Sequence, residues 1–173
     1  TTSAPFDAAS AVSGYTDNCG GAVTATLADT EVTGTDCGWT VTYTFTVRDK
    51  CGNELTGQRY SNTGSEQTPP EFTVPADIII CRTTDCSYDI SPSVTGDVYD
   101  ETDNCSTGLE ATYTDDDSGL VDCDQAGFIK RTWTLKDNCN NTTTKIQTIW
   151  IEPVPRLTLV PSRDTICSGQ STN

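Results

Sequence analysis

The chain contains no histidine and no methionine, and only 10 lysines and arginines stand against 25 acids in its 173 residues. Without histidine, the usual general base and the Ser–His and Cys–His catalytic arrangements are absent. Carboxylate pairs could still hydrolyse glycosides, but these acids recur at repeated positions or lie in turn-like sequence. We therefore expect no enzyme. The net charge of -15 also disfavours nucleic acid and anionic lipid as partners, because both repel an acidic surface.

Long apolar stretches are missing too. The longest aliphatic run, Ile78–Ile80, is far too short to span a membrane. Val, Ile, Leu and Phe supply only 31 of 173 residues, which together with high net charge normally indicates disorder. Nine cysteines argue against disorder, because disulfides stabilise domains with small cores. They predict an oxidising, extracellular location, and since no signal peptide opens the chain, we expect a mature or internal piece of an exported protein.

The cysteines recur with a period near 86 residues. This spacing separates three pairs and a spacing of 88 separates a fourth: Cys19 and Cys105, Cys37 and Cys123, Cys81 and Cys167, then Cys51 and Cys139. The flanking residues also repeat, since Thr-Asp-Asn precedes both Cys19 and Cys105. Prolines at 69–70 and 153–155 suit domain boundaries. The sequence therefore predicts a repeat lacking its first strand over 1–68, a complete repeat over 69–154 and the start of a third over 155–173.

Two segments alternate between apolar and polar residues, as half-buried strands do. In residues 40–47 the inward residues are expected to be Val41, Tyr43, Phe45 and Val47; in 128–135 they are Ile129, Trp133 and Leu135. Arg131 interrupts the second pattern and is expected near the rim of the domain. Residues 145–152 predict a further strand, whereas 58–63 predict an irregular, weakly paired edge. We expect an all-β fold of tandem immunoglobulin-like antiparallel β-sandwich repeats stapled by disulfides.

The cysteine positions restrict disulfide pairing. A strand of about eight residues spans roughly 26 Å, whereas bonded cysteines have Cα atoms within about 7 Å, so Cys37 cannot bond Cys51 and Cys123 cannot bond Cys139. The shared Asp-X-Cys turn context predicts Cys19–Cys51 and Cys105–Cys139. Two alternatives remain for the others: Cys81–Cys123, or Cys37–Cys81 with Cys123–Cys167. The pairing of Cys37, Cys86 and Cys167 stays open, and a zinc site is disfavoured because there is neither a CxxC pair nor histidine.

Acidic residues beside these cysteines are candidate calcium ligands. Asp17 and Asp49 should lie close together if Cys19 bonds Cys51, and Asp103 and Asp137 should do so beside Cys105–Cys139. Calcium requires six to eight oxygen ligands, which carboxylates and turn carbonyls can supply. Aspartate also caps tight turns by accepting backbone hydrogen bonds, and we prefer this simpler interpretation. Three aromatic residues are candidates to stack on a sugar, although burial or an inter-domain contact is favoured for each: Trp39, Tyr60 and Trp150.

The combined motifs resemble the four-cysteine, hyalin-repeat-like (HYR-like) domains of large Bacteroidota surface proteins, in particular gliding-motility adhesins of the SprB type. The resemblance lies in Thr-Asp-Asn-Cys, the aromatic–threonine strand at 131–134, the Asp-X-Cys-Gly/Asn-Asn turns and Gln147-Thr148-Ile149. It covers most of 69–154 and roughly 16–53. It implies an immunoglobulin-like fold, type IX export and a stalk role at the cell surface. Asn140 where Gly52 stands in the first copy, and the extra Cys86, depart from the pattern.

The sequence thus favours a structural segment of a secreted adhesin, whose partners are neighbouring repeats of the same chain. A module that binds surface polysaccharide or another adhesin subunit is the alternative, and calcium is the one candidate cofactor. No direct membrane insertion is expected.

Overall fold

The computed structural model of the chain describes residues 3–154, so the predicted third repeat at 155–173 lies outside the described residues. Two short helices, α1 (Ala8–Ala11) and α2 (Pro92–Thr95), accompany the strands, and no helix in the described part is long and apolar enough to cross a membrane. The strands are β1 (Thr24–Thr35), β2 (Gly38–Arg48), β3 (Glu54–Gly64), β4 (Glu71–Thr73), β5 (Ile78–Cys81), β6 (Tyr99–Thr102), β7 (Thr112–Asp116), β8 (Gly127–Lys136) and β9 (Thr142–Glu152). The predicted all-β class is confirmed, and the antiparallel sheets are consistent with a β-sandwich.

The chain divides into two compact units. In the described part, the first comprises residues 3–74, 98–114 and 132–146, and the second comprises 75–97, 115–131 and 147–154. Strands β7, β8 and β9 contribute residues to both units. The repeat and its boundary at 68/69 stay predictions drawn from the cysteine spacing.

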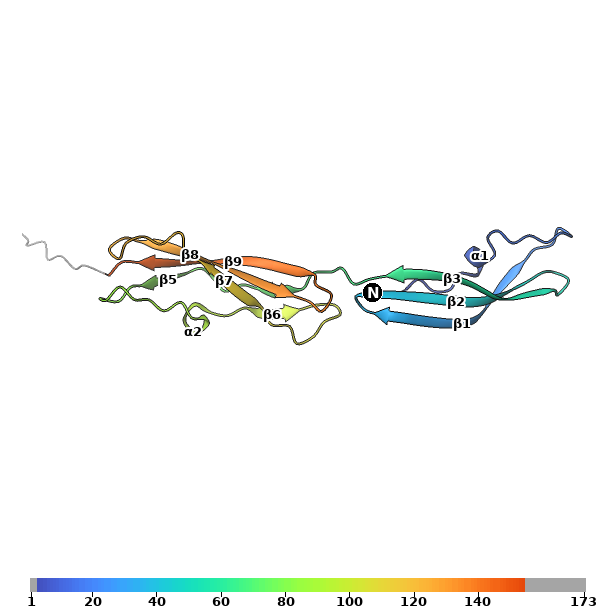
Figure 1. The fold of residues 1–173 in the computed structure, drawn as a ribbon, viewed down its shortest axis with the longest axis horizontal. Coiled ribbons are helices and arrows are strands. Elements are labelled where there is room, and N and C mark those ends of the chain that lie inside the picture. The colour runs from blue at the N-terminus through green and yellow to red at the C-terminus, as the bar shows by residue number, and fades with distance from the viewer. Residues whose placement is uncertain (1–2, 155–173) are drawn as a thin grey trace, which may run out of the picture. The chain divides into compact units, whose positions relative to one another are not determined.

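In the first unit, β1, β2 and β3 form an antiparallel sheet with β2 in the middle (Figure 1). The predicted alternation along β2 is confirmed, because the four residues predicted to face inward are at most 5% exposed: Val41, Tyr43, Phe45 and Val47. The intervening threonines lie on the opposite, wetter face, which suits their β-branched and polar side chains. Phe6, Tyr15 and Tyr60 complete this core by packing on the buried face.

The segment 58–63 is more regular than predicted. It belongs to β3, an 11-residue strand paired with β2 from Glu54 to Gly64 apart from one register shift. Its edge position is as predicted, but the weak pairing is wrong. The sequence shows few apolar residues here because only Tyr60 packs into the core, while the backbone pairing with β2 requires no particular side chains.

The first unit has a second apolar cluster. Phe72 on β4 packs with Trp133 and Leu135 on β8, and these three residues are at most 3% exposed. The β4 strand pairs antiparallel with β6. Trp133 and Leu135 therefore face inward as the alternation predicted.

In the second unit, the core consists of Ile129, Ile149 and Ile151, none of which is more than 1% exposed. These side chains come from β8 and β9, which neighbour each other in the four-stranded sheet ordered β5-β9-β8-β7. The β5 strand pairs with β9 in parallel, from Ile78 opposite Ile149 to Cys81 opposite Glu152. The strand predicted over 145–152 is confirmed within β9.

Arg131 is buried, not at the rim as predicted. It is 1% exposed, and its guanidinium forms a bidentate pair with Asp115 on β7 at 2.7 and 2.8 Å. It also donates hydrogen bonds to Thr95 and to the carbonyl of Ile90. A buried charge is tolerated when it is paired and hydrogen-bonded in this way.

We expect the substitution Asp115→Asn to destabilise the fold by about 3 kcal/mol, because it removes the carboxylate that forms a bidentate pair with the buried Arg131 cation. Urea denaturation followed by circular dichroism measures the change. Asp117→Asn, two residues further along and exposed, is the matched control and should shift stability by less than about 0.5 kcal/mol. Equal effects of the two substitutions would contradict the ion pair's role.

Candidate functional site

A disulfide between Cys37 and Cys139 joins residues 102 apart in the sequence, with an S–S distance of 2.02 Å and a Cα–Cα distance of 4.9 Å. Cys37 lies in the turn between β1 and β2, and Cys139 lies in the turn between β8 and β9. Loop-closure arguments assign roughly 4.7 kcal/mol of stabilisation to a loop of this size. That figure is comparable to the whole stability of a small domain, so this cross-link is the strongest candidate for a functional element.

The turn that carries Cys139 is built around Asp137. The Asp137 carboxylate accepts hydrogen bonds from the backbone of Cys139 and of Asn141, both at 2.8 Å, and from the Asn141 side chain at 2.7 Å. Asn140 adopts a left-handed backbone with φ of 73°, and its counterpart Gly52 has φ of 93°. Asparagine tolerates this conformation better than most residues, so the departure from glycine leaves the turn unchanged.

Glu66 links the two turns that the disulfide joins. Its backbone N–H donates to the carbonyl of Asp36 in the Cys37 turn at 2.9 Å, and its carboxylate accepts from the Asn141 side chain in the Cys139 turn. The same carboxylate accepts from the backbone N–H of Thr68. Glu66 is only 3% exposed, so this acidic residue is a buried connector that positions both ends of the cross-link.

The pKa of Asp137 is below its ordinary value. Burial raises this pKa, but hydrogen bonds from the side chain and backbone of Asn141, then those with Glu66 and with the backbone of Cys139, outweigh the burial. The ionised form is therefore the one that the turn stabilises.

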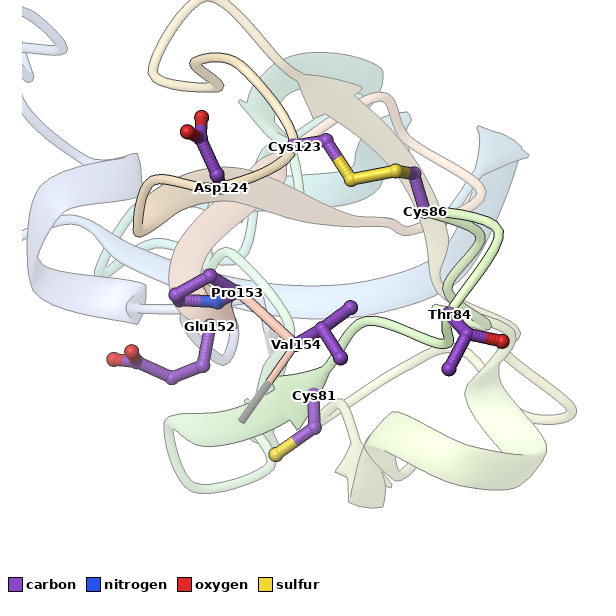
Figure 2. A pocket seen from close by; sticks show the side chains of 8 residues that line it. All are labelled: Cys81, Thr84, Cys86, Cys123, Asp124, Glu152, Pro153 and Val154. Atoms are coloured by element: carbon purple, nitrogen blue, oxygen red, sulfur yellow. A yellow bond between two sulfur atoms is a disulfide. The ribbon is translucent and has the colours of Figure 1, made fainter. Parts of the chain in front are cut away.

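The second disulfide joins Cys86 to Cys123, 37 residues apart. It lines a pocket together with Cys81, Thr84, Asp124, Glu152, Pro153 and Val154. Figure 2 shows the Cys81 side chain set apart from this disulfide, with its sulfur pointing away from it. Cys81 is an exposed free thiol, so the pocket combines two carboxylates with a disulfide and a separate thiol.

The disulfides differ from the pairings that the sequence predicted and from the alternatives that it left open. Cys139 bonds Cys37 and not Cys105, so the predicted Cys105–Cys139 pairing is wrong for this structure. The predicted Cys19–Cys51 bond is absent as well, since both cysteines are free. The alternative Cys81–Cys123 is excluded because Cys123 bonds Cys86. The alternatives that joined Cys37 to Cys81, or Cys123 to Cys167, are excluded by the same two bonds. Cys19, Cys51, Cys81 and Cys105 are free in the structure, and Cys167 lies outside the described residues. The Asp-X-Cys pattern identified the turns, but a turn does not specify its partner.

The four candidate calcium ligands all cap turns. Asp17 accepts from the backbone of Cys19 and Gly21, and Asp49 accepts from the backbone and side chain of Asn53. Asp103 accepts from Cys105 and Ser106, and Asp137 caps as described above. These bonds are the turn-capping role that the sequence favoured.

The calcium hypothesis required Asp17 to lie near Asp49, and Asp103 to lie near Asp137. Asp17 and Asp49 line one shared pocket with Asn18 and Asn53. In the described residues, the carboxylate Oδ1 of Asp103 is the one calcium-ligand candidate atom that is buried without a hydrogen-bond partner. A calcium ion requires several such oxygens, so this arrangement fits turn capping better, and calcium binding stays a prediction.

Sequence reasoning missed Glu66. It lies in the polar stretch Ser65-Glu66-Gln67, which has no periodicity and no motif, so nothing in the sequence marked it as buried. Cys37 was recognised as a cysteine at one end of a strand, but its partner was left open.

Comparison with known proteins returned no assignment: no protein-family model matches the chain, and no curated protein matches it.

We expect the free energy of unfolding to fall as the pH drops below about 4, the ordinary pKa of aspartate. Because the folded-state pKa of Asp137 is lowered, its contribution is complete above the unfolded-state pKa and is lost as the pH falls through the folded-state value. Asp137→Asn should therefore flatten the profile measured by urea denaturation between about pH 5 and pH 2. Asp49, whose pKa is lowered chiefly by the Asn53 side chain, should give a similar result when replaced by Asn. A variant profile parallel to that of the unmodified chain would contradict this role.

Proposed function

We propose that the chain is a structural stalk segment of a large exported cell-surface adhesin, in line with its resemblance to HYR-like domains. The observation that carries this proposal is the Cys37–Cys139 bond, which closes a loop of 102 residues in a protein with small apolar cores. A covalent bond withstands pulling that separates hydrogen-bonded strands, whose individual bonds contribute only about 1 kcal/mol each. A stalk that transmits force between a cell and a surface requires this property.

The location supports the same proposal. Disulfides persist in non-reducing compartments, so the chain belongs outside the cytoplasm, either in the periplasm or outside the cell. Placement on the bacterial surface after type IX export, and a part in gliding motility, are the further steps that the resemblance suggests. Neighbouring repeats of the same chain are the partners that a stalk needs, because in a tandem array each unit contacts those next to it.

Carbohydrate binding is a second candidate function, favoured by one exposed aromatic residue. Trp150 is 45% exposed on β9, and its ring lies 5.6 Å from that of Phe128 on β8 in an edge-to-face arrangement. Ile79, opposite Trp150 on β5, is 63% exposed. An aromatic ring on an exposed sheet face can stack on a sugar. By contrast, Tyr60 packs among core aromatics, and Trp39 is partly buried.

For the stalk function, we expect reduction to lengthen the extension of a single stretched chain. With the Cys37–Cys139 bond intact, about 102 residues at roughly 3.4 Å each, or about 350 Å, cannot extend under load. Force spectroscopy on the full chain, held at its two ends before and after reduction, measures the difference. Equal extension in both states would contradict a mechanical role for the cross-link.

The surface location has its own test. An antibody raised against the chain should label intact producing cells, and protease added outside should remove the label. Labelling that requires permeabilised cells would overturn the surface assignment while leaving the mechanical result untouched.

The carbohydrate alternative predicts that the full chain binds a defined set of glycans on an array, and that Trp150→Ala abolishes this binding. The loss follows from removing the stacking surface. Tyr99→Ala changes another exposed aromatic residue, 55% exposed, and should leave the binding unchanged. Absence of reproducible glycan binding, or equal loss in both variants, would exclude Trp150 as a sugar platform.

A further inference from the structure

We propose that Cys105 competes with Cys37 for Cys139, so that thiol–disulfide exchange moves this cross-link between two positions. In one state Cys139 bonds Cys37, as in the structure. In the other it bonds Cys105, which is a free, partly exposed thiol. The chain would then carry a covalent connection that can be re-formed without any added oxidant.

The Cys105 turn lies against the Cys139 turn. The backbone N–H of Asn138 donates a hydrogen bond to the hydroxyl of Ser106 at 3.2 Å. Cys105 directly precedes Ser106 and Cys139 directly follows Asn138, so both cysteines adjoin the residues that make this contact. The turn carrying the free thiol therefore touches the turn carrying the disulfide.

The turns that carry Cys105 and Cys139 have the same aspartate cap. The backbone N–H of Cys105 donates to the Asp103 carboxylate at 2.8 Å, and that of Cys139 donates to the Asp137 carboxylate at 2.8 Å. In each turn the cysteine follows the capping aspartate by two residues. Each cysteine is thus carried by a short turn capped by an aspartate, and both turns lie outside the strands.

The turn between β2 and β3, which carries Cys51, has a similar neighbour. A Cβ placed on Gly21, in the Cys19 turn, would lie 2.7 Å from the Asp17 carboxylate and 3.1 Å from Cβ of Lys50, which precedes Cys51. The turns of Cys19 and Cys51 therefore touch as well, and both cysteines are free. The proximity of an Asp-Asn-Cys turn to a hairpin turn thus occurs twice in the molecule.

The exchange step balances without a further reagent. The thiolate of Cys105 attacks Sγ of Cys139, the Cys105–Cys139 bond forms and the Cys37–Cys139 bond breaks. Cys37 leaves as a thiolate and takes up the proton that Cys105 released. One disulfide and one thiol are present before and after, so the step can run in either direction.

The consequence is mechanical. The Cys37–Cys139 bond closes 102 residues, whereas a Cys105–Cys139 bond would close only 34. At about 3.4 Å per residue, the exchange releases roughly 230 Å of chain that can extend under load. The same molecule could therefore present a short and a long form without losing a disulfide.

Disulfide mapping of the full chain tests the proposal. Oxidised protein is incubated without oxygen or reductant at about pH 8, where thiolates are populated, and is then quenched with acid, alkylated and cleaved before aspartates. This cleavage places Cys37, Cys105 and Cys139 in separate peptides. We expect the Cys105–Cys139 peptide to grow over minutes to hours, while alkylation of Cys37 rises and that of Cys105 falls by equal amounts.

The variant Cys105→Ser should keep only the Cys37–Cys139 bond, and Cys37→Ser should form Cys105–Cys139 on oxidation. Cys81→Ser, which removes an exposed free thiol from the second unit, is the matched control and should exchange as the unmodified chain does. The proposal is overturned if Cys139 stays with a single partner throughout, or if it remains a thiol in oxidised Cys37→Ser. Force spectroscopy adds an independent reading: two extension lengths about 230 Å apart support exchange, and one length contradicts it.

Discussion

Covalent cross-linking compensates for the scarcity of apolar side chains, and the other features of the fold depend on it. In residues 3–154, each of the three core clusters contains only three buried apolar residues. A small core rarely supplies more than a few kcal/mol of net stability, whereas one disulfide that closes a long loop contributes a similar amount. The chain can therefore keep its acidic, threonine-rich surface, because its stability does not rest on burial alone.

Two buried charged residues, Arg131 and Glu66, occupy positions that apolar residues fill in larger cores. Arg131 occupies a position where the strand pattern called for an apolar residue, and it is stabilised by Asp115 and by two further acceptors. Glu66 is buried in the same sense, since its backbone and carboxylate satisfy groups from both turns that the disulfide joins. Buried charged groups of this kind contribute specificity of position more than net stability. Arg131 ties β8 to β7 and to the α2 segment, whereas Glu66 links the two turns that the Cys37–Cys139 bond joins.

The strands could be predicted from the sequence because their signal is local. Val41 to Val47 and Ile129 to Leu135 alternate with period two, and each inward residue is buried as that period requires. The burial of Arg131 could not be predicted, because it depends on an aspartate from a neighbouring strand. Disulfide partners were predicted wrongly for a related reason. Cys105 and Cys139 share a turn motif, but the choice between Cys37 and Cys105 as partner of Cys139 depends on tertiary contacts made through Glu66 and Ser106.

The turn motif and the tertiary contacts need not be in conflict. The Ser106–Asn138 contact brings the Cys105 turn against the Cys139 turn, and the contacts of Glu66 link the Cys37 turn to the same turn. A cysteine with two neighbours of its own kind can bond only one of them at a time, so one thiol must remain. In the proposed stalk this leftover thiol has a mechanical consequence, because pulling favours whichever bond leaves the longer chain free to extend. Load itself would then bias the exchange toward Cys105, and the length of the segment would respond to the tension it carries.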